Sequence, residues 1–287
     1  MSGYLIVANP GAGSGDRSPA AEARRRLADA RSLTLEQGVD LKAAIDEAVA
    51  EERIVVAAGG DGTIHAVAQH LVHRGTLGIL PMGTVNNFAR DLGVGRAEVA
   101  LAALEDPRPR QIDVGRVGSR IFVNNLSVGL YPELVRHRER IEDDVGRWAA
   151  AAAAAYRVLR RGRPLTGIAT ADGDRRLLSA WVLFVGNNRF RASATRPGVR
   201  DRLDEGVLDV RVITARPGSR RARAAWRILR GRDWPLRRQV RTPARRLQVI
   251  LDDARAIAFD GEMGARAARF TVETVPGALR VLGAPDD

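Results

Sequence analysis

The sequence predicts an α/β domain followed by a β-rich domain, and two observations carry this prediction. In the first 106 residues, short apolar runs alternate four times with segments of helical apolar spacing, which is typical of a doubly wound parallel sheet. After Asp106-Pro107-Arg108-Pro109, most segments read as strands linked by turn residues, which indicates a β-sandwich-like domain. At 287 residues, the chain has room for two domains that share a cleft.

Composition excludes several classes of protein. The apolar fraction of 45% is enough for full hydrophobic cores, so a disordered chain is excluded. The chain has no cysteine, which excludes disulfides, thiolate metal sites and cysteine nucleophiles. No apolar run reaches the roughly 18–20 residues that span a bilayer, and the run from Tyr4 to Ala8 is too short for an export signal. We therefore expect a cytoplasmic protein that associates peripherally with a membrane.

The positive charge is concentrated in one window. The net charge is +12, and residues 216–246 hold twelve arginines and one acid, Asp233. Within this window, a predicted helix from Ser219 to Gly231 places Trp226 and Leu229 on one apolar face. Such a basic amphipathic helix suits an anionic membrane surface, although a solvated helix remains an alternative. No helix-turn-helix, RRM or zinc-finger pattern accompanies it, so we expect no nucleic-acid partner.

A glycine-rich turn follows the apolar run from Arg53 to Ala58. Gly59-Gly60-Asp61-Gly62-Thr63 leads from this predicted strand into a helix that continues through Ile64. Glycines let the backbone approach a phosphate, and the first helical N–H groups point at it. Asp61 beside a phosphate needs a bridging cation or a proton. The turn therefore indicates nucleotide phosphate with Mg²⁺, while plain strand-helix packing remains the alternative.

Two more loops of this kind follow predicted strands. Tyr4–Ala8 leads into Asn9-Pro10-Gly11-Ala12-Gly13-Ser14-Gly15, and Leu77–Leu80 leads into the stretch from Pro81 to Arg90. Because ligands of such sheets bind at the carboxyl ends of the strands, three loops at one edge strengthen the phosphate interpretation. The chain contains no GxxxxGK[ST] motif, since Lys42 is its sole lysine. The remaining predicted elements are a helix from Ser18-Pro19, a short strand at Leu33–Leu35 and a helix at Val39–Glu52.

Three motifs carry a resemblance: Asn9-Pro10 with Gly13 and Gly15, Gly59-Gly60-Asp61-Gly62-Thr63, and Leu80-Pro81-Met82-Gly83-Thr84-Val85-Asn86-Asn87-Phe88-Ala89. They resemble the catalytic domain of the diacylglycerol kinase and sphingosine kinase family, in particular its soluble bacterial lipid kinases. The second motif is shared with NAD kinases and phosphofructokinases, which have a related nucleotide fold, but the third separates this sequence from them. The resemblance is strong to about Asp113 and looser beyond.

The resemblance implies a domain organisation and an ATP site. It places an ATP-binding catalytic domain at residues 1–113 and a β-rich lipid-substrate domain at 114–277, with a tail of about 278–287 that returns to the first domain. The expected cofactors are ATP and Mg²⁺. ATP is expected across Asn9, Pro10, Gly13, Thr34, Gly59, Gly60, Asp61, Gly62, Thr63, Ile64, His65, Gly83, Thr84, Asn86 and Asn87.

The sequence departs from the family pattern at two positions. His65-Ala66 replaces the usual Asn-Glu, and Asn87 replaces a common aspartate, so two carboxylates are missing from the expected cleft. We interpret His65 as an exposed imidazole at the start of a helix, with a functional role as the alternative. His70 and His73 are expected at the surface rather than in a zinc site.

The second half contains eight predicted strands and two predicted helices. One helix is the arginine-rich segment above, and the other, from about Pro132 to Arg161, contains seven alanines. It is interpreted as a closely packed helix, with a wall of a lipid pocket as the alternative. The strands are Gln111–Val117, Arg120–Val128, Thr166–Ala171, Leu177–Gly186, Val207–Thr214, Arg246–Leu251, Arg255–Phe259 and Phe270–Val275, and Ala278–Leu282 returns to the first domain.

Two acidic motifs complete the candidate site. Phe259-Asp260-Gly261-Glu262 resembles the late Asp-Gly-Glu motif of the family, which implies that Asp260 or Glu262 is the base for a substrate hydroxyl. A simple hairpin turn is the alternative. The segment from Arg202 to Asp209 resembles a structural Mg²⁺ site, which implies ligands at Arg202, Glu205 and Val207, with Glu205 replacing the usual aspartate.

The predicted function is ATP-dependent phosphoryl transfer to a lipid hydroxyl, with Asp61 as a candidate catalytic residue. The alternatives are a nucleotide-sensing or membrane-binding protein with weak turnover and, less favoured, an NAD kinase. The expected partners are a lipid acceptor and an anionic membrane surface. Which lipid is phosphorylated and whether the chain forms a homodimer stay open.

Overall fold

A computed structural model of the chain describes residues 3–9, 18–83, 86–129, 163–191, 199–215 and 239–284. The predicted helices at Pro132–Arg161 and Ser219–Gly231 lie outside the described residues. Within the described part, no helix has the length and apolar character needed to cross a membrane. The chain divides into unit 1, which is Met1–Val114, Arg202–Glu205 and Val275–Asp287, and unit 2, which is Gly115–Asp201 and Gly206–Thr274.

Unit 1 alternates strands and helices, and side chains cap two of its helices. The Ser18 hydroxyl accepts the Ala21 N–H at 3.2 Å, and the Asp40 carboxylate accepts the Ala43 N–H at 3.0 Å, which satisfies N–H groups that a helix start leaves unpaired. The elements are β1 Tyr4–Ala8, α1 Pro19–Arg26, β2 Ala30–Thr34, α2 Leu41–Ala50, β3 Ile54–Gly59, α3 Asp61–Leu71, β4 Thr76–Pro81, α4 Asn87–Asp91 and α5 Ala97–Glu105.

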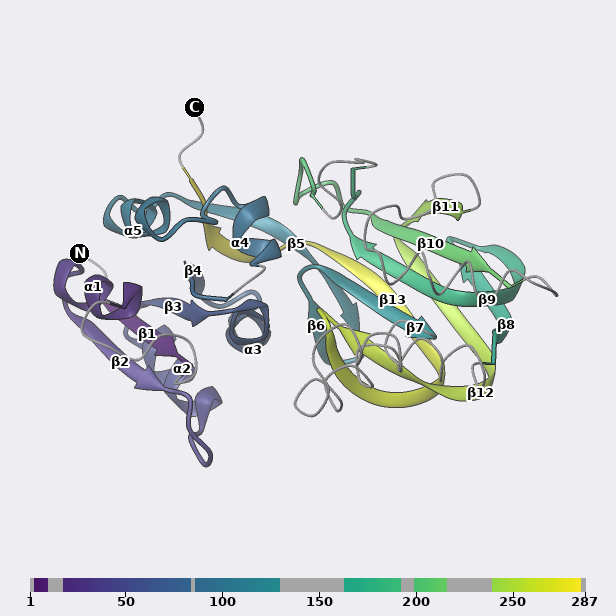
Figure 1. The fold of residues 1–287 in the computed structure, drawn as a ribbon, viewed down its shortest axis with the longest axis horizontal. Coiled ribbons are helices and arrows are strands. Elements are labelled where there is room, and N and C mark those ends of the chain that lie inside the picture. The colour runs from purple at the N-terminus through teal and green to yellow at the C-terminus, as the bar shows by residue number, and fades with distance from the viewer. Residues whose placement is uncertain are drawn as a thin grey trace, which may run out of the picture. The chain divides into compact units, whose positions relative to one another are not determined.

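The strands of unit 1 form a parallel sheet in the order β2-β1-β3-β4, and the end of β13 (Glu262–Leu282) pairs with β4 (Figure 1). All residues of β3 and β4 are buried, as expected for parallel strands covered by helices. α2 contacts α3, and α1 contacts α5. The chain moves from β1 to β2 on one side and then to β3 on the other, so the order of the strands reverses between β1 and β3.

Unit 2 consists of antiparallel strands. β5 runs from unit 1 into unit 2, and β13 runs back from unit 2 into unit 1. The elements before β13 are β5 Pro109–Val117, β6 Arg120–Phe122, β7 Asn125–Gly129, β8 Leu165–Ala171, β9 Asp174–Asn187, β10 Leu208–Thr214, β11 Gln239–Ala244 and β12 Arg246–Phe259.

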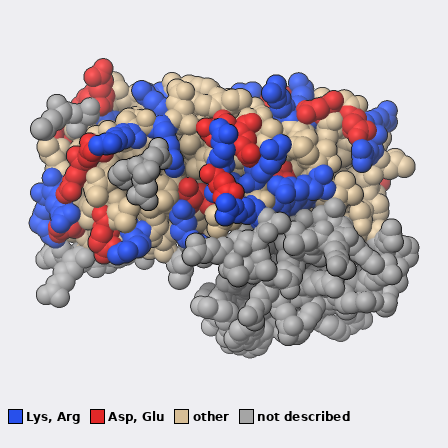
Figure 2. Space-filling model, turned by 90° about the horizontal axis from the view of Figure 1, so that it is seen from above, with Lys and Arg blue, Asp and Glu red and all other residues tan. Residues whose placement is uncertain are grey.

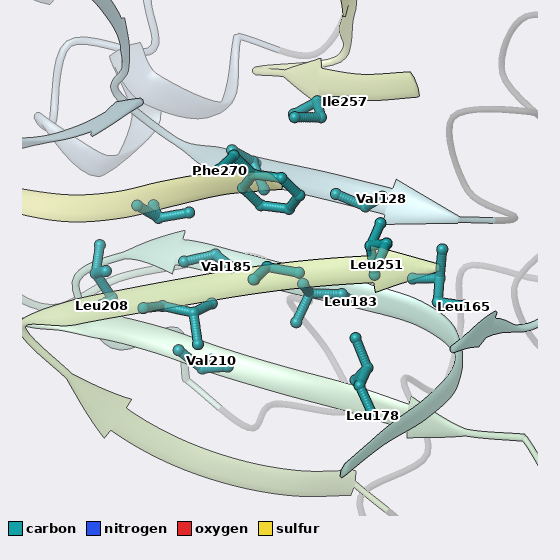
Figure 3. Packing of buried hydrophobic residues seen from close by; sticks show 14 of the residues in the cluster. Val128, Leu165, Leu178, Leu183, Val185, Leu208, Val210, Leu251, Ile257 and Phe270 are labelled. Atoms are coloured by element: carbon teal, nitrogen blue, oxygen red, sulfur yellow. The ribbon is translucent and has the colours of Figure 1, made fainter. Parts of the chain in front are cut away.

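Two long strands of unit 2 each change partner along their length. β9 pairs with β8 over its first half and with β7 over its second half. β12 makes the same change, from β8 to β7. These four strands and their neighbours β6, β10, β11 and β13 share one apolar core. Its side chains point toward one another in Figure 3, among them Val128, Leu165, Val185 and Leu251.

Several strand boundaries differ from the sequence expectation. The predicted segments Arg246–Leu251 and Arg255–Phe259 form one strand, β12, because irregular pairing with β13 carries the ladder through Asp252–Ala254. The predicted strand Arg120–Val128 is interrupted at Val123-Asn124 and forms β6 and β7. β11 was not predicted, since Gln239–Ala244 lies in the arginine-rich window and contains Pro243.

Charged residues of both signs are mixed over the face shown in Figure 2. Neighbouring residues form many of the exposed ion pairs, such as Lys42–Asp46 at 2.6 Å and Arg108–Asp106 at 2.7 Å. Exposed pairs of this kind contribute little to stability because water screens them. In the described part of the chain, these ion pairs place a negative charge beside many of the arginine side chains.

Candidate functional site

The carboxyl ends of β1, β2 and β3 lie together at one edge of the sheet in unit 1. The Asn9 N–H donates to the Ala58 carbonyl at 3.3 Å, and the Leu35 N–H donates to the Ala8 carbonyl at 2.8 Å. Asn9 and Thr34 therefore lie at adjacent strand ends. The crevice where the strand order reverses is the usual ligand site of such sheets, and it lies here between β1 and β3.

The loops after β3 and β4 approach each other through glycine. A Cβ atom on Gly83 would lie 2.8 Å from the Cα atom of Gly60, which is too close for a side chain. The Met82 N–H also donates to the Gly59 carbonyl at 3.0 Å. The structure thus brings two of the predicted phosphate loops into direct backbone contact.

Asp61 joins the same two loops. Its carboxylate oxygens accept the N–H groups of Asn87 at 3.2 Å and Phe88 at 3.3 Å, at the start of α4. Asn86 closes the loop before α4, because its side-chain amide accepts the Gly83 N–H at 3.0 Å and donates to the Gly83 carbonyl at 2.6 Å. Asp61 therefore lies beside the loop of Asn86 and Asn87, although Asn87 follows it by 26 positions in the sequence.

The side chains that follow Gly62 point into the protein. Thr63, Ile64 and His65 are 6%, 0% and 4% exposed, and they lie in α3, which contacts β3, β4 and α2. The prediction of an exposed His65 imidazole is therefore wrong. Any role of these three residues in nucleotide binding involves their backbone, and the Ile64 N–H already donates to the Gly60 carbonyl at 3.1 Å.

The remaining nucleotide candidates are only partly covered by the structure. Gly59 is the last residue of β3, and Gly62 lies in the first turn of α3. Pro10, Gly13 and Thr84 lie outside the described residues. His70, at the end of α3, is partly buried, and burial together with the neighbouring Arg74 cation lowers its pKa.

The Phe259–Glu262 motif forms the turn between β12 and β13. Asp260 and Gly261 have φ angles of 51° and 94°, the pattern of a two-residue hairpin, and Phe259 pairs with Glu262. The Asp260 carboxylate accepts three N–H groups, from Val123 at 2.9 Å, Asn124 at 2.7 Å and Asn125 at 2.9 Å. Asp260 therefore fastens the turn to the β6–β7 connection.

Glu262 has a different environment from Asp260. Its side chain is 49% exposed, and one carboxylate oxygen lies 3.8 Å from the guanidinium of Arg120. Arg120 also lies over the Phe259 ring, 4.6 Å from the ring centroid. Of the two candidate bases, Glu262 is the one with the more accessible carboxylate. No pattern in the sequence indicates Arg120 as its neighbour, because 142 residues separate the two.

The metal candidates were Arg202, Glu205 and Val207. The Arg202 guanidinium donates to Asp204 at 2.9 Å, and this hydrogen bond holds the pKa of the Asp204 carboxyl below its usual value. In unit 2, the Val207 carbonyl accepts the Asn188 N–H at 2.9 Å. The described residues contain no group of three or more His, Asp or Glu side chains that fits a metal ion. The Mg²⁺ site at these positions therefore stays a prediction.

Comparison with known proteins assigns the chain to a family. The model of the diacylglycerol kinase catalytic domain matches residues 3–117, and that of the YegS C-terminal NAD kinase beta sandwich-like domain matches residues 135–283. The chain belongs to the diacylglycerol kinase family of lipid kinases. This family membership makes the chain a kinase, a phosphotransferase. Its architecture is accordingly a kinase catalytic domain followed by a β-sandwich-like domain.

Relatives and solved structures are similar to most of the chain. A protein of Pseudomonas aeruginosa named "Probable lipid kinase YegS-like" is 32% identical over 91% of this chain and 85% of its own length. The fold matches a diacylglycerol kinase structure from Bacillus anthracis with a TM-score of 0.73 and 21% identity, covering 99% of this chain and 98% of the other. It also matches an NAD kinase from Archaeoglobus fulgidus in complex with ATP, with a TM-score of 0.57 and 15% identity over 98% and 94% of the two chains.

Proposed function

We propose that this kinase transfers the γ-phosphate of ATP to the hydroxyl group of a lipid, with a diacylglycerol-like molecule as the acceptor. One observation carries the nucleotide part of the proposal: Asp61 and the Gly60–Gly83 backbone contact join two phosphate-type loops at the carboxyl edge of a parallel sheet. The names of the relatives support the lipid part.

Mg²⁺ fits the site at Asp61, between the loops after β3 and β4, only together with the nucleotide. A carboxylate offers about four lone-pair positions, and Asp61 uses two of them for the N–H groups of Asn87 and Phe88. The described residues supply no complete set of metal ligands, and Mg²⁺ is commonly held by one or two carboxylates plus substrate phosphates. Asp61 would therefore hold the ion beside the ATP phosphates. When bound, the ion neutralises phosphate charge.

In the proposed reaction, Glu262 accepts the proton of the lipid hydroxyl. The hydroxyl oxygen forms a bond to the γ-phosphorus, and the bond from this phosphorus to the β,γ-bridging oxygen breaks, so ADP leaves with the electron pair. Glu262 is preferred over Asp260 because its carboxylate is accessible, whereas three backbone N–H groups occupy that of Asp260.

The test of this function is transfer of labelled phosphate from ATP to a panel of lipids, read by thin-layer chromatography. The panel contains diacylglycerol, a sphingoid base, a glycolipid and an isoprenoid alcohol, with NAD⁺ as a separate acceptor. The proposal expects a labelled lipid. ATP binding without transfer to any acceptor would favour a nucleotide sensor, and labelled NADP⁺ would favour an NAD kinase.

Glu262→Gln is expected to lower kcat by about 10²–10⁴-fold, because glutamine cannot accept the proton. Its thermal stability should stay near that of the wild type, since the Glu262 side chain is half exposed and its ion pair with Arg120 is long. The measurement is kcat with the labelled lipid, together with the melting temperature of each variant.

Asp260→Ala serves as the matched variant in the same turn. It should lower the free energy of unfolding by about 2 kcal/mol or more, because three N–H groups lose a charged acceptor. Equal kcat for Glu262→Gln and the wild type would exclude Glu262 as the base.

We also propose peripheral association with an anionic membrane, supported by the arginine-rich window at residues 216–246. A basic residue near an anionic membrane contributes about 1 kcal/mol. Most of this window lies outside the described residues, so the proposal rests on its sequence. A cytoplasmic location is likewise a prediction, and whether the protein is a monomer or a homodimer stays open.

A further inference from the structure

Arg200 is a buried arginine of unit 2 that the proposed reaction does not use. It is 3% exposed, and its guanidinium lies 5.2 Å from the centroid of the Phe190 ring. The guanidinium donates to the Val123 carbonyl at 2.6 Å, the Asn187 carbonyl at 3.0 Å and the side-chain oxygen of Asn124 at 2.8 Å. Because a buried charge is costly unless it is hydrogen-bonded, these acceptors fix the guanidinium. Two of them belong to residues 123–125, which we call the 123–125 segment.

Asp260 holds the same segment from the opposite side. Its carboxylate accepts the Asn124 N–H at 2.7 Å and the Asn125 N–H at 2.9 Å. The Val123 carbonyl and the Asn124 N–H belong to one peptide group, and in a trans peptide these two groups point in opposite directions. Arg200 therefore binds the oxygen end of this peptide group, while Asp260 binds its N–H end.

Hydrogen bonds at the two ends of a peptide group strengthen each other. A cation at the carbonyl oxygen and a carboxylate at the N–H polarise the group in the same direction, and the effect is larger away from water. The next peptide group is also bonded at both ends, since the Asn124 carbonyl accepts the Asn187 N–H at 2.9 Å and Asp260 accepts the Asn125 N–H. Loss of Arg200 should therefore weaken the hydrogen bonds between Asp260 and the 123–125 segment.

The turn that carries Glu262 depends on this segment. Asp260 and Gly261 are the central residues of the turn, and Glu262 follows them. The Asp260 N–H also donates to the Asn125 carbonyl at 2.8 Å, so both the backbone and the side chain of Asp260 are bound to the segment. The Glu262 side chain is 49% exposed, and its ion pair with Arg120 is long, at 3.8 Å. The backbone of the turn therefore determines where the Glu262 carboxylate lies.

We propose that Arg200 is a positioning residue for Glu262. By holding the peptide group between Val123 and Asn124, it fixes Asp260 and with it the turn. The turn then keeps the Glu262 carboxylate where it accepts the proton of the lipid hydroxyl, so the inference rests on the proposed function. A displacement of about 1 Å at a reacting group can cost about 10²-fold in rate. A buried residue outside the reacting groups can therefore control kcat.

The first test is hydrogen exchange, which needs no substrate. Arg200→Gln should speed exchange at the Asn124 and Asn125 amides by about 10–100-fold relative to the amides of β9, because their hydrogen bonds to the Asp260 carboxylate weaken. The melting temperature of the variant is measured in parallel. Unchanged relative exchange at these two amides would overturn the inference, whether or not the protein phosphorylates a lipid.

Arg211→Gln is the matched control. Arg211 is also a buried arginine of unit 2, at 7% exposed, and its guanidinium lies 5.8 Å from the centroid of the Phe190 ring. It donates to Asp209 and to the Phe190 carbonyl rather than to the 123–125 segment. The control should lower the melting temperature, but it should change neither the relative exchange of the two amides nor kcat at a temperature where the protein stays folded.

The second test is a double-mutant cycle with Glu262→Gln. Arg200→Gln alone should lower kcat for lipid phosphorylation by about 10–100-fold. It should change the KM for ATP by less than about twofold, because the predicted phosphate loops belong to unit 1. In the Glu262→Gln background, Arg200→Gln should lower kcat further by less than about twofold, since no base is left to displace. An equal loss in both backgrounds would show a purely stabilising role and overturn the inference.

Asn124→Ala keeps the cycle decisive if Arg200→Gln does not fold. It removes one acceptor of Arg200 and leaves the hydrogen bonds to the carbonyl oxygens of Val123 and Asn187. It should show a smaller loss of kcat than Arg200→Gln and the same lack of additivity with Glu262→Gln. Additive losses together with a low kcat in Glu262→Gln would overturn this inference alone. Wild-type kcat in Glu262→Gln would contradict the proposed base and the inference together.

Discussion

Asp61→Ala should lower kcat/KM for lipid phosphorylation by at least about 10³-fold. The substitution removes the negative charge that would hold Mg²⁺ beside the phosphates. It also removes the acceptor of the Asn87 and Phe88 N–H groups, so the loop that carries Gly83 loses one of its connections to the start of α3. The cost in stability should be modest, about 1 kcal/mol, as for the loss of a helix cap. The measurements are kcat/KM with labelled ATP and the melting temperature.

Two further variants separate charge from structure at this site. Asp61→Asn keeps a side-chain oxygen that accepts an N–H group but removes the charge, so its stability should be near that of the wild type and its activity low. Asp40→Ala removes the cap of α2 in the same unit and should reduce stability without reducing kcat/KM. Wild-type activity in Asp61→Asn would restrict Asp61 to a structural role.

Asp209→Ala should destabilise the protein by about 3–5 kcal/mol, because it leaves a buried arginine without its anion. Asp209 on β10 is 1% exposed and accepts hydrogen bonds from Arg211 at 2.6 Å, Arg241 at 2.8 Å and the Phe190 N–H at 3.0 Å. Arg211 is itself only 7% exposed. A loss of this size corresponds to a fall in melting temperature of about 10 °C.

Asp174→Ala is the matched control for this prediction. Asp174 on β9 forms an exposed ion pair with Arg176 at 2.6 Å, and its removal should leave the melting temperature unchanged because water already screens the pair. The double substitution Asp209→Leu with Arg211→Leu should recover part of the lost stability, since it removes the buried Arg211 charge together with its anion and leaves only Arg241, whose side chain is 40% exposed to water. Equal melting temperatures for Asp209→Ala and Asp174→Ala would show that the buried cluster does not stabilise unit 2.

The sequence was most informative where one local pattern determined one element. The apolar run of β3 and the glycines after it predicted a buried strand, a turn and a helix, and these are present. The sequence could not show that Asp61 binds the start of α4, because that hydrogen bond joins residues 26 and 27 positions apart. It could not show that His65 is buried, because tertiary packing around α3 decides which of its side chains are covered.

Contacts between residues far apart in the sequence explain the remaining differences between the sequence predictions and the structure. Arg255–Phe259 and Arg246–Leu251 looked like separate strands because charged residues stand between them, but pairing with β13 makes them continuous. Asp260 looked like a base because of its motif, and only the fold brings the backbone of Val123–Asn125 to its carboxylate. The hydrogen bonds from Arg200 to Val123 and Asn124 span 77 and 76 positions, so no local pattern indicates them.

The path of β13 has a consequence for how the protein is made. Arg280 and Val281, near the end of this strand, pair with β4, so the parallel sheet of unit 1 is completed only after unit 2 has been synthesised. Until then, a nascent chain would present β4 as an unpaired edge, which is a common site of aggregation. We therefore expect a fragment of residues 1–117 to be poorly soluble when expressed alone. Supplying the segment 275–284 on the same polypeptide through a short linker should improve its solubility.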